Sequence, residues 1–509
     1  MSKPLVLTCD IGTQSARALL VDPDGRIVDV VQSKYAEPYF SKEPGWAEQK
    51  PNFYFDRLCE CCRELCARSN ALLPDVIAMT ITVIRDTVVC LDANNEPLRD
   101  IILWLDKRTV DPNGAMPAKN MMLFKVAGME PTAKVVYAAS VGNWIMRHEP
   151  EIWARTAKYV MLPTYLNYKL TGNLIDSASN QIGHIPFDYK NRRWMKPGSL
   201  TRCFCDVPNE KLCDLVPSGT VIGTVTDEVC ALTGIPAGLP LISTGSDKGC
   251  ETLGLAVVDS DKASISLGTT ATIQFSTTEY VEPQQFLPAY PGVLNDHYNP
   301  EIEIYRGLWL LSWFVKEFGT ADAIDAKEKG IAPEALLDER IRDLPPYWTA
   351  GILHPDSLGA VIGFSDYHTR YHFYRAIIEG LCLELYMALR IMEDRSGLTI
   401  HEIRIGGGGA KSDVVCQIAA DVFGLPVVRS QTHEACSIGS SMVAFVAKGV
   451  FADFDAAAKA MVHVKDTFQP NERNHEVYND IYEQAYRKIY PRLRPIYQKL
   501  IQVKRRIAQ

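Results

Sequence analysis

The sequence lacks any long apolar run, since nowhere do about 18 apolar residues follow one another, and this excludes a membrane-spanning helix. The opening residues, MSKPLVLTCD, lack the extended apolar stretch and the small-residue cleavage site of a secretory signal. We therefore expect a cytoplasmic protein with no membrane partner. Low-complexity linkers are missing as well, so we expect its domains to pack closely against one another.

An excess of positive charge is also missing. The 53 Lys and Arg residues are outnumbered by 61 Asp and Glu residues, which gives a net charge of −8. A mildly acidic chain is a poor candidate for a broad nucleic-acid-binding face, so we expect no nucleic-acid partner. Apolar residues make up 47% of the 509 residues, which is typical of a globular protein. At roughly 150 residues per domain, this length predicts two to four domains.

Cysteine is plentiful, and its pattern needs an interpretation. Four of the 14 cysteines lie in LCECCRELC: Cys59, Cys61, Cys62 and Cys66. A zinc site needs paired ligands and a second pair further along the chain. This cluster falls instead on a predicted helix, where three of the four share a face with two leucines. Packing as small apolar side chains is therefore favoured over a metal site, and without a secretory signal the thiols are expected to stay reduced.

The chain opens with two apolar runs joined by a polar tip, followed by a turn at Pro23–Arg26 and a third run. This pattern predicts an antiparallel three-stranded meander, and it is not the strand–helix–strand start of a dinucleotide-binding fold. A second strand–turn–strand pattern, ASISLGTTATIQFST, occupies 263–277. Two hairpins with polar tips predict two similar domains that face one another.

Other segments have clear periodicity or turn residues. The strongest helix pattern covers 371–395, and residues 401–424 predict a strand, a glycine loop and a helix. Tyrosines 478, 482, 486 and 490 recur every four residues, so we expect one helix face that docks on the core. The stretch 283–350 suggests only helix and loop, without a site. The remaining predictions are helices at 51–68 and 432–449 (the latter rich in small residues), strands at 75–82 and 87–92, mixed helix and loop at 115–215, and strand–helix–strand at 219–247.

Three motifs suit phosphate binding. In DIGTQSAR (10–17) a carboxylate precedes a loop with free backbone N–H groups, so the tip could hold phosphate and Asp10 could hold Mg²⁺; an ordinary polar turn is the alternative. LGTTA (267–271) offers the same chemistry. IGGGGAKS (405–412) places glycines between a strand and a helix, which suits a nucleotide. It is not a P-loop, because Ala410 stands where that motif needs glycine.

Two further motifs suit an alcohol substrate. STGSDKGCE (243–251) places Asp247 in a turn after an apolar strand, where it could be a general base toward a hydroxyl group or could cap the next helix. VIRDTVV (83–89) places Arg85 and Asp86 between two strands. One side chain donates and the other accepts hydrogen bonds, which suits polyol recognition; a surface ion pair is the alternative.

The order of these motifs resembles the FGGY carbohydrate kinase family, which includes xylulokinases and glycerol kinases, within the actin/hexokinase/heat-shock ATPase fold superfamily. The resemblance covers nearly the whole chain. Its segments are DIGTQSARALLVD, GWAEQKPNFYFD (45–56), VIRDTVVCLD with ILWLDKR (102–108), STGSDKG, SLGTTA, LGAVIGF (358–364), YRAIIEGLC (374–382), GGGAKSDVVCQIAADVFGLPV (407–427) and EACSIGSSMVAF (434–445).

The resemblance implies an α/β fold of two ribonuclease-H-like domains with a cleft between them. It implies a sugar-binding domain at 1–252, a nucleotide-binding domain at 253–455 and a helical extension packed on the core at 456–509. The implied activity is ATP- and Mg²⁺-dependent phosphorylation of a hydroxyl group of a small sugar or polyol. The alternatives are a catalytically silent sugar- or nucleotide-binding member and, with less support, a chaperone-like ATPase. Many relatives are dimers, and the sequence leaves a homodimer open.

The resemblance also assigns roles to residues. Asp247 would be the general base and Asp10 would face the metal. Substrate would be bound by Arg85, Asp86 and Trp104; nucleotide and its phosphates would be bound by Gly12, Thr13, Gln14, Gly268, Thr269, Gly407, Gly408 and Ser412. Lys248, which follows Asp247, is a further candidate substrate-binding residue.

Two positions depart from the family pattern. Glycerol kinases carry Arg-Glu, and xylulokinases usually Met-His, where this chain has Arg85 and Asp86. Lys248 follows the expected base, where Gln or Asn is common. That lysine could favour an acidic substrate, hold the transferring phosphate or point into solvent. The substrate itself stays open.

Overall fold

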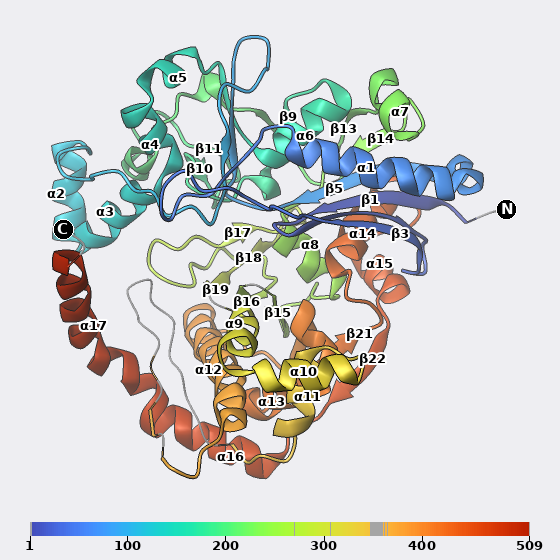
Figure 1. Cartoon of the computed structure of the whole chain (residues 1–509). Helices are drawn as coiled ribbons and strands as arrows, with labels where there is room; N and C mark the ends of the chain where they lie inside the picture. Colours follow the sequence, from blue (N-terminus) through green and yellow to red (C-terminus); the bar gives the residue numbers. More distant parts are fainter. Residues whose placement is uncertain are drawn as a thin grey trace.

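Two six-stranded sheets, one in each half of the chain, form the framework of the protein in the computed structural model (Figure 1). The structure describes residues 3–268, 270–305, 307–346, 360, 362–363 and 365–507. The first sheet has the strand order β13-β14-β5-β1-β2-β3, and the second has the order β19-β16-β15-β20-β21-β22.

The first sheet begins with the predicted meander, which is confirmed. Polar residues at its first tip and Asp24-Gly25 at its second allow the chain to reverse between buried strands. β5 then runs parallel to β1, and β14 runs parallel to β5. The strands are β1 (Leu5–Ile11), β2 (Ser15–Val21), β3 (Ile27–Lys34), β5 (Val76–Val83), β13 (Val221–Thr224) and β14 (Pro240–Ile242).

The second sheet repeats this plan. β15 and β16 form an antiparallel hairpin, β20 runs parallel to β15, and β21 runs parallel to β20. The prediction of two similar, ribonuclease-H-like domains is therefore confirmed. The strands are β15 (Lys262–Leu267), β16 (Ala271–Phe275), β19 (Glu301–Ile304), β20 (Glu402–Gly406), β21 (Val427–Ser430) and β22 (Val464–Phe468).

Helix α1 (Phe53–Arg68) carries the cysteine cluster and covers the first sheet. All four thiols are buried in the core that α1 forms with the sheet, and Cys62 Sγ lies 3.4 Å from Cys9 Sγ on β1. Burial raises the pKa of Cys59 to about 12 and that of Cys61 to about 11, so both stay protonated. The interpretation of these cysteines as small packing residues is confirmed.

The predicted tyrosine face lies against α12 (Arg370–Ser396), which covers the second sheet. Tyr478 donates a hydrogen bond of 2.7 Å to Glu379, and Tyr486 donates one of 2.6 Å to Glu384. Both tyrosines and Tyr482 are buried. These aromatic rings dock α16 (Glu472–Ile481) and the following π-helical turn, η6 (Tyr482–Tyr486), onto the core, as predicted.

Helices α8 (Asp247–Gly254) and α14 (Ala435–Ala447) join the two halves. They approach so closely at Gly254 and Gly439 that a Cβ on either glycine would lie 1.9 Å from a backbone carbonyl oxygen of the other helix. Although α14 follows β21 in the chain, it packs beneath the first sheet, where Ser440 hydrogen-bonds Thr8 of β1. The small side chains of this helix therefore serve close packing, as their composition predicts.

One predicted region is wrong. Residues 283–350 include three strands besides the expected helices, because Glu301–Ile304 alternates polar and apolar residues and pairs with the free edge of β16. The strands there are β17 (Tyr290–Pro291), β18 (Tyr298–Asn299) and β19; the helices are α9 (Trp309–Phe318), α10 (Thr320–Glu328) and α11 (Pro333–Ile341).

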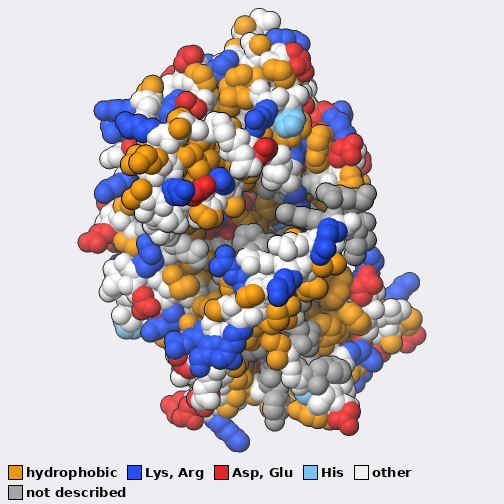
Figure 2. Space-filling view, turned by 90° about the vertical axis from the view of Figure 1, so that its left-hand side faces the viewer, with side chains coloured by type: hydrophobic (Ala, Val, Ile, Leu, Met, Phe, Trp, Pro, Cys, Tyr) orange, Lys and Arg blue, Asp and Glu red, His pale blue; other side chains and the backbone are white. Residues whose placement is uncertain are grey.

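The segment after residue 455, expected to be helical, also includes the edge strand β22. Its last helix, α17 (Arg487–Ile507), has eight Lys and Arg and no acidic residue in its sequence. Figure 2 views the face along which α17 runs, and basic side chains are prominent there. Within the described ranges, no helix is both long and apolar enough to span a membrane.

The other elements lie mostly on the first half. The other strands are β4 (Glu48–Gln49), β6 (Val88–Leu91), β7 (Ile101–Ile102), β8 (Lys158–Met161), β9 (Ile175–Ser177), β10 (Phe187–Asp188), β11 (Arg193–Trp194) and β12 (Asp214–Val216). The other helices are α2 (Ala118–Val126), α3 (Glu130–Ala139), α4 (Val141–His148), α5 (Pro150–Arg155), α6 (Leu162–Thr171), α7 (Asp227–Thr233), α13 (Asp413–Phe423) and α15 (Phe454–Met461), with short turns η1 (Asn70–Asp75), η2 (Ala178–Asn180), η3 (Leu200–Phe204), η4 (Asn209–Lys211) and η5 (Gly408–Lys411).

Candidate functional site

Asp10 lies near the end of β1, beside the tip of the first hairpin. Its carboxylate accepts a hydrogen bond of 3.1 Å from Arg17, whose Nε lies 3.4 Å from Glu434 at the start of α14. Burial raises the pKa of Asp10 to about 7; Arg17 opposes this shift, and the carboxylates of Glu434 and Asp247 add to it. Negative charge therefore exceeds positive charge around this buried oxygen pair.

The hairpin tip itself consists of Gly12, Thr13 and Gln14. The Gly12 N–H donates to the Ser15 carbonyl at 3.0 Å, which closes the tip, and the side chain of Gln14 is exposed. The indole N–H of Trp104 donates a hydrogen bond of 3.0 Å to Thr13 Oγ1. Two residues that are 91 positions apart, and that were assigned to different ligands, thus lie side by side.

Asp247 is the first residue of α8. The helix cap is Ser246, whose Oγ accepts from the Gly249 N–H at 3.2 Å, so the Asp247 carboxylate does not serve as the N-cap. Its Oδ1 accepts from the Lys248 N–H at 2.8 Å and lies 3.5 Å from Arg85 Nε. The side chain remains 25% exposed, so a ligand can reach it.

Arg85 connects the two halves of the molecule. From the turn between β5 and β6 it makes a bidentate contact with Glu301 of β19, at 2.8 and 3.2 Å. Glu303 lies 4.0 Å away, and the guanidinium group lies over the ring of Tyr290 at 5.6 Å. A charged residue of the first half is therefore held by an edge strand of the second.

Asp86 contacts a residue that the sequence did not single out. Both oxygens of its carboxylate bind His184: Oδ2 lies 2.7 Å from the ring Nδ1, and Oδ1 accepts from the backbone N–H at 2.9 Å. Asp86 also has φ = 47°, a conformation that few residues other than glycine adopt. Such strain is maintained only where the surroundings fix it.

Lys248 points toward the second sheet. Its ammonium group donates to Glu251 at 2.8 Å and to Ser266 of β15 at 2.7 Å. Burial alone would lower the pKa of Lys248, but the carboxylates of Glu251 and Asp247 hold it above its ordinary value. The sequence left open that Lys248 points into solvent, and these two contacts exclude that alternative.

The glycine motifs of the second half meet at the end of β15. Gly268 begins the tip of the second hairpin, and its N–H donates to the Thr270 carbonyl at 3.0 Å. Gly407 has φ = 76°, and a Cβ there would lie 2.7 Å from the Leu267 carbonyl, so only glycine fits against β15. Gly408 follows as the first residue of η5.

Ser412 and Thr269 stand apart from this group. Ser412 caps α13, where its Oγ accepts from the Val415 N–H at 3.2 Å. Thr269, and part of the 358–364 segment of the resemblance, lie outside the described residues.

Electrostatic interactions therefore link Asp10, Arg85 and Lys248 to Asp247, and Lys248 reaches Ser266 near the Gly268 tip. Thr13 and Trp104 contact each other at the first hairpin tip, which follows Asp10. Sequence reasoning missed Tyr290, Glu301, Glu303 and His184. The alternation Glu-Ile-Glu-Ile was a usable signal for a strand at 301–304. His184 has no comparable signal, because a single histidine after a glycine reveals nothing about its neighbours.

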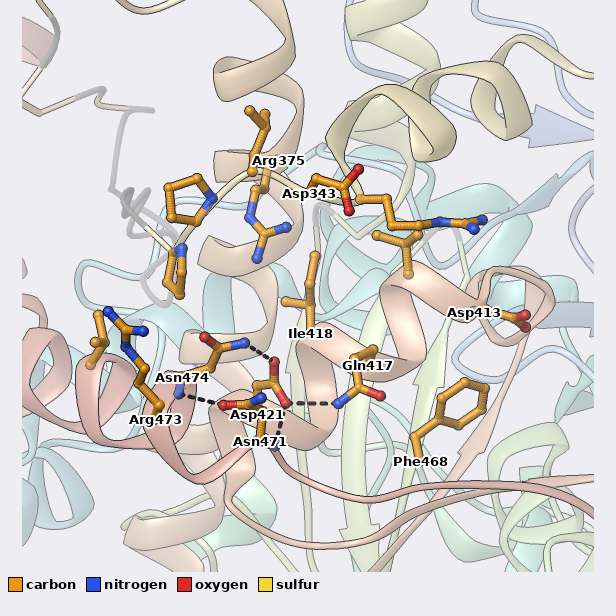
Figure 3. A pocket seen from close by; sticks show the side chains of 16 residues that line it. Asp343, Arg375, Asp413, Gln417, Ile418, Asp421, Phe468, Asn471, Arg473 and Asn474 are labelled. Atoms are coloured by element: carbon orange, nitrogen blue, oxygen red, sulfur yellow. Dashed lines mark hydrogen bonds between the residues drawn. The ribbon is translucent and has the colours of Figure 1, made fainter.

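A cavity of about 840 Å³ lies elsewhere, between α13, α16 and β22 (Figure 3). Its polar side chains are largely bonded to each other: Asp421 accepts from Gln417, from Asn474 and from the Asn471 N–H, each at 2.8 Å. None of the residues clustered around Asp247 lines it. The cluster, not this cavity, concentrates the predicted chemistry.

Comparison with known proteins gives matches along almost the entire chain. The model of the N-terminal domain of the FGGY family of carbohydrate kinases matches residues 5–254, and that of the C-terminal domain matches residues 263–448. A xylulose kinase of Staphylococcus epidermidis is 28% identical over 503 residues, which cover 94% of this chain and 95% of that protein. The uncharacterized sugar kinase YgcE of Escherichia coli K12 is 27% identical over 489 residues, covering 94% and 92%.

Solved structures show the same fold. A ligand-bound xylulose kinase from Lactobacillus acidophilus superposes with a TM-score of 0.82 at 21% identity, over 98% of this chain and 100% of that one. A Plasmodium falciparum glycerol kinase with ADP superposes with a TM-score of 0.75 at 18% identity, over 95% and 97%. The two-domain architecture is thus the one that the resemblance implied.

Proposed function

Since the chain belongs to the FGGY family of carbohydrate kinases, we propose that it transfers the γ-phosphoryl group of ATP to a hydroxyl group of a small, neutral sugar or polyol. Asp247 acts as the general base. It accepts the hydroxyl proton while the alcohol oxygen bonds to phosphorus and the bond to the ADP oxygen breaks.

The placement of Asp247 is the observation that carries this proposal. A partly exposed carboxylate lies at the start of α8, with Asp10 on one side and Lys248 connecting to β15, the strand that ends just before Gly268. Phosphoryl transfer requires little covalent chemistry from the protein; it requires a base, a phosphate cradle and a metal within reach of one hydroxyl group. The two hairpin tips, at Gly12 and at Gly268, would line the cradle.

The charge balance around Asp247 favours an uncharged substrate. Arg85 is held by Glu301 at 2.8 Å, Lys248 by Glu251 at 2.8 Å, and Arg17 by Asp10 at 3.1 Å. Each of these cations is thus already compensated by a carboxylate, and Glu303 and Glu434 add further negative charge nearby. An aldonate or sugar phosphate would meet repulsion here, whereas hydroxyl groups find many acceptors.

A magnesium ion fits this environment. Within the described part of the chain, no group of three or more His, Cys, Asp or Glu side chains is arranged to hold a metal. Mg²⁺ usually needs only one or two carboxylates, together with water and substrate phosphates. The buried Asp10, whose pKa is raised to about 7 amid excess negative charge, suits such a role. The ion would neutralise the charge of the transferring phosphoryl group.

A coupled ADP-release assay tests the proposal. The panel pairs neutral compounds with anionic analogues of equal length: xylulose and xylitol with xylonate, glycerol with glycerate. Xylulose comes first because several relatives are named xylulose kinase. We expect turnover of at least one neutral compound and at least a tenfold lower kcat/KM for its anionic analogue. Nucleotide binding without turnover of any sugar would favour the silent binding protein instead.

The base is tested with Asp247→Asn. We expect this variant to lose at least about 100-fold in kcat, as is typical when a general base is removed, while its affinity for ATP stays within twofold of wild type. Asp227→Asn is the matched control, because Asp227 is likewise the first residue of a helix, α7, after a hydroxyl cap. Wild-type kcat in Asp247→Asn would refute the assignment.

A further inference from the structure

His184 and Asp86 form a dyad near the proposed general base, and the phosphoryl transfer itself does not use the histidine. The imidazole Nδ1 lies 2.7 Å from Asp86, so the ring nitrogen Nε2 points away from that carboxylate. The His184 side chain is 33% exposed, and Nε2 makes no hydrogen bond to any of the described residues. A polar atom is thus held in a fixed direction and left open to a ligand.

The loop around the dyad is built to hold it. Gly183 has φ = 149°, and a Cβ there would lie 2.2 Å from the Asp86 carboxylate, so only glycine allows this approach. The Tyr189 hydroxyl bridges the loop backbone, accepting from the Gly183 N–H at 3.2 Å and donating to its carbonyl at 3.0 Å. The Asp86 N–H in turn donates to the Ile182 carbonyl at 3.1 Å.

The dyad also adjoins the cluster around Asp247. Asp86 follows Arg85 in the chain, and Arg85 Nε lies 3.5 Å from Asp247. The ring of Tyr189 packs edge-on against Tyr290 at 5.7 Å, and Tyr290 lies beneath the Arg85 guanidinium. The dyad is therefore linked to Asp247 through Arg85, its neighbour in the chain, and through the packing of Tyr189 on Tyr290.

We propose that His184, oriented by Asp86, is a specificity-determining residue that donates its Nε2–H to a carbonyl or hydroxyl oxygen of the neutral sugar. This inference rests on the proposed function and deepens it. Asp86 then acts as a positioning residue, because both of its oxygens are engaged by His184. The sequence predicted that the Asp86 carboxylate contacts the substrate; in this proposal the imidazole of His184 makes that contact instead.

The protonation state supports a donor role. Burial alone would lower the pKa of His184, but Asp86 raises it above its ordinary value, which favours the form of the ring in which Nε2 carries a proton. The charged and titratable groups around the dyad are Arg85, Tyr159, Tyr189, Cys205 and Tyr305. Their pKa values all lie well above that of a histidine, so His184 is the group that loses a proton first.

Steady-state kinetics of His184→Ala and His184→Gln test the inference. We expect His184→Ala to raise the sugar KM by about 10- to 100-fold, the range for loss of a hydrogen bond to a charged group, with the ATP KM within twofold. His184→Gln, which keeps an N–H donor, should recover part of that loss. His297→Ala is the control. His297 Nδ1 also lies 2.8 Å from an aspartate, Asp296, but His297 is not one of the candidate site residues.

The pH dependence distinguishes recognition from a structural role. As pH rises through the raised pKa of His184, the donor is lost, so the sugar KM should increase on the alkaline side in wild type and stay flat in His184→Gln. Asp86→Asn removes the charge that raises this pKa and should move the increase to lower pH.

The outcomes separate the two proposals. An active wild type whose His184→Ala variant melts normally and keeps its sugar KM would overturn the role of His184 alone. A wild type that neither binds nor phosphorylates any sugar of the panel would overturn the proposed function, and this role with it. Calorimetric titration of sugar into nucleotide-saturated protein measures binding without relying on turnover.

Discussion

At the scale of single residues, the site is made of charges that are already paired. Arg85, Lys248 and Arg17 each contact a carboxylate within about 3 Å, and two of these contacts lie almost wholly out of solvent. A buried ion pair adds little net stability when intact, but removing one partner leaves an uncompensated charge. We therefore expect these ion pairs to fix the positions of Asp247 and its neighbours rather than to add stability.

The Glu301→Gln variant tests the effect of removing one partner of a buried ion pair. Loss of this carboxylate leaves the buried Arg85 without its bidentate partner, and we expect a loss of about 3 kcal/mol in the free energy of unfolding. Arg85 would then turn toward Asp247, 3.5 Å away, and hold the base, so kcat should fall about tenfold. Urea unfolding and steady-state kinetics measure the two effects.

Glu303→Gln is the comparison, since Glu303 lies 4.0 Å from Arg85 and is 25% exposed. Its effect on stability should stay below about 1 kcal/mol. Equal losses of stability in Glu301→Gln and Glu303→Gln would mean that the bidentate contact between Arg85 and Glu301 contributes nothing to stability.

At the scale of elements, α8 and α14 pack with their backbones in direct contact. At Gly439 an added methyl group would lie 1.9 Å from the Cys250 carbonyl, and both groups belong to helix backbones that cannot easily move. Because α8 begins with Asp247, separation of these helices would also displace the proposed general base. Packing and catalysis therefore depend on the same pair of glycines.

We expect Gly439→Ala to lower the free energy of unfolding by about 3 kcal/mol, the upper range for overpacking a tight core. Gly449→Ala is the control just after the same helix: its φ is 71°, and an added Cβ meets nothing within 4 Å. Backbone strain alone should lower its stability by about 1 kcal/mol. Thermal unfolding of both variants measures the difference, and equal losses would exclude a steric cause.

At the scale of the whole molecule, groups from both sheets contribute to one site. Arg85 from the first half contacts Glu301 in the second, and Lys248 contacts Ser266 in the same way. A sugar near Asp247 and a nucleotide near Gly268 and Gly407 would each bind between the halves. Each ligand should therefore favour the arrangement that the other needs.

We expect this coupling to appear in the stability of the protein. At 100 times its Kd, either ligand alone should add about 2.7 kcal/mol to the free energy of unfolding. The sugar found in the assay and a non-hydrolysable ATP analogue together should exceed the sum of the two by about 1 kcal/mol or more. Thermal unfolding at four ligand combinations tests this, and strict additivity would mean that the two sites are independent.

The sequence by itself determined most elements and the order of the motifs. Local rules suffice for these: strands alternate or run apolar, and glycine and aspartate mark turns. The two hairpins, the buried cysteine face of α1 and the tyrosine face of α16 and η6 follow from spacing alone. The family resemblance then predicted two domains with a cleft between them, and it assigned the role of general base to Asp247.

Only the tertiary structure decided which charges meet. Arg85 and Glu301 are 216 residues apart, and Asp86 and His184 are 98 apart. No local pattern records such contacts, because they depend on how two sheets and a connecting loop pack. The same packing turned Lys248 toward β15 and moved α14 beneath the first sheet. Electrostatic complementarity acts through space, so the partners of a charged residue emerge only when the chain is folded.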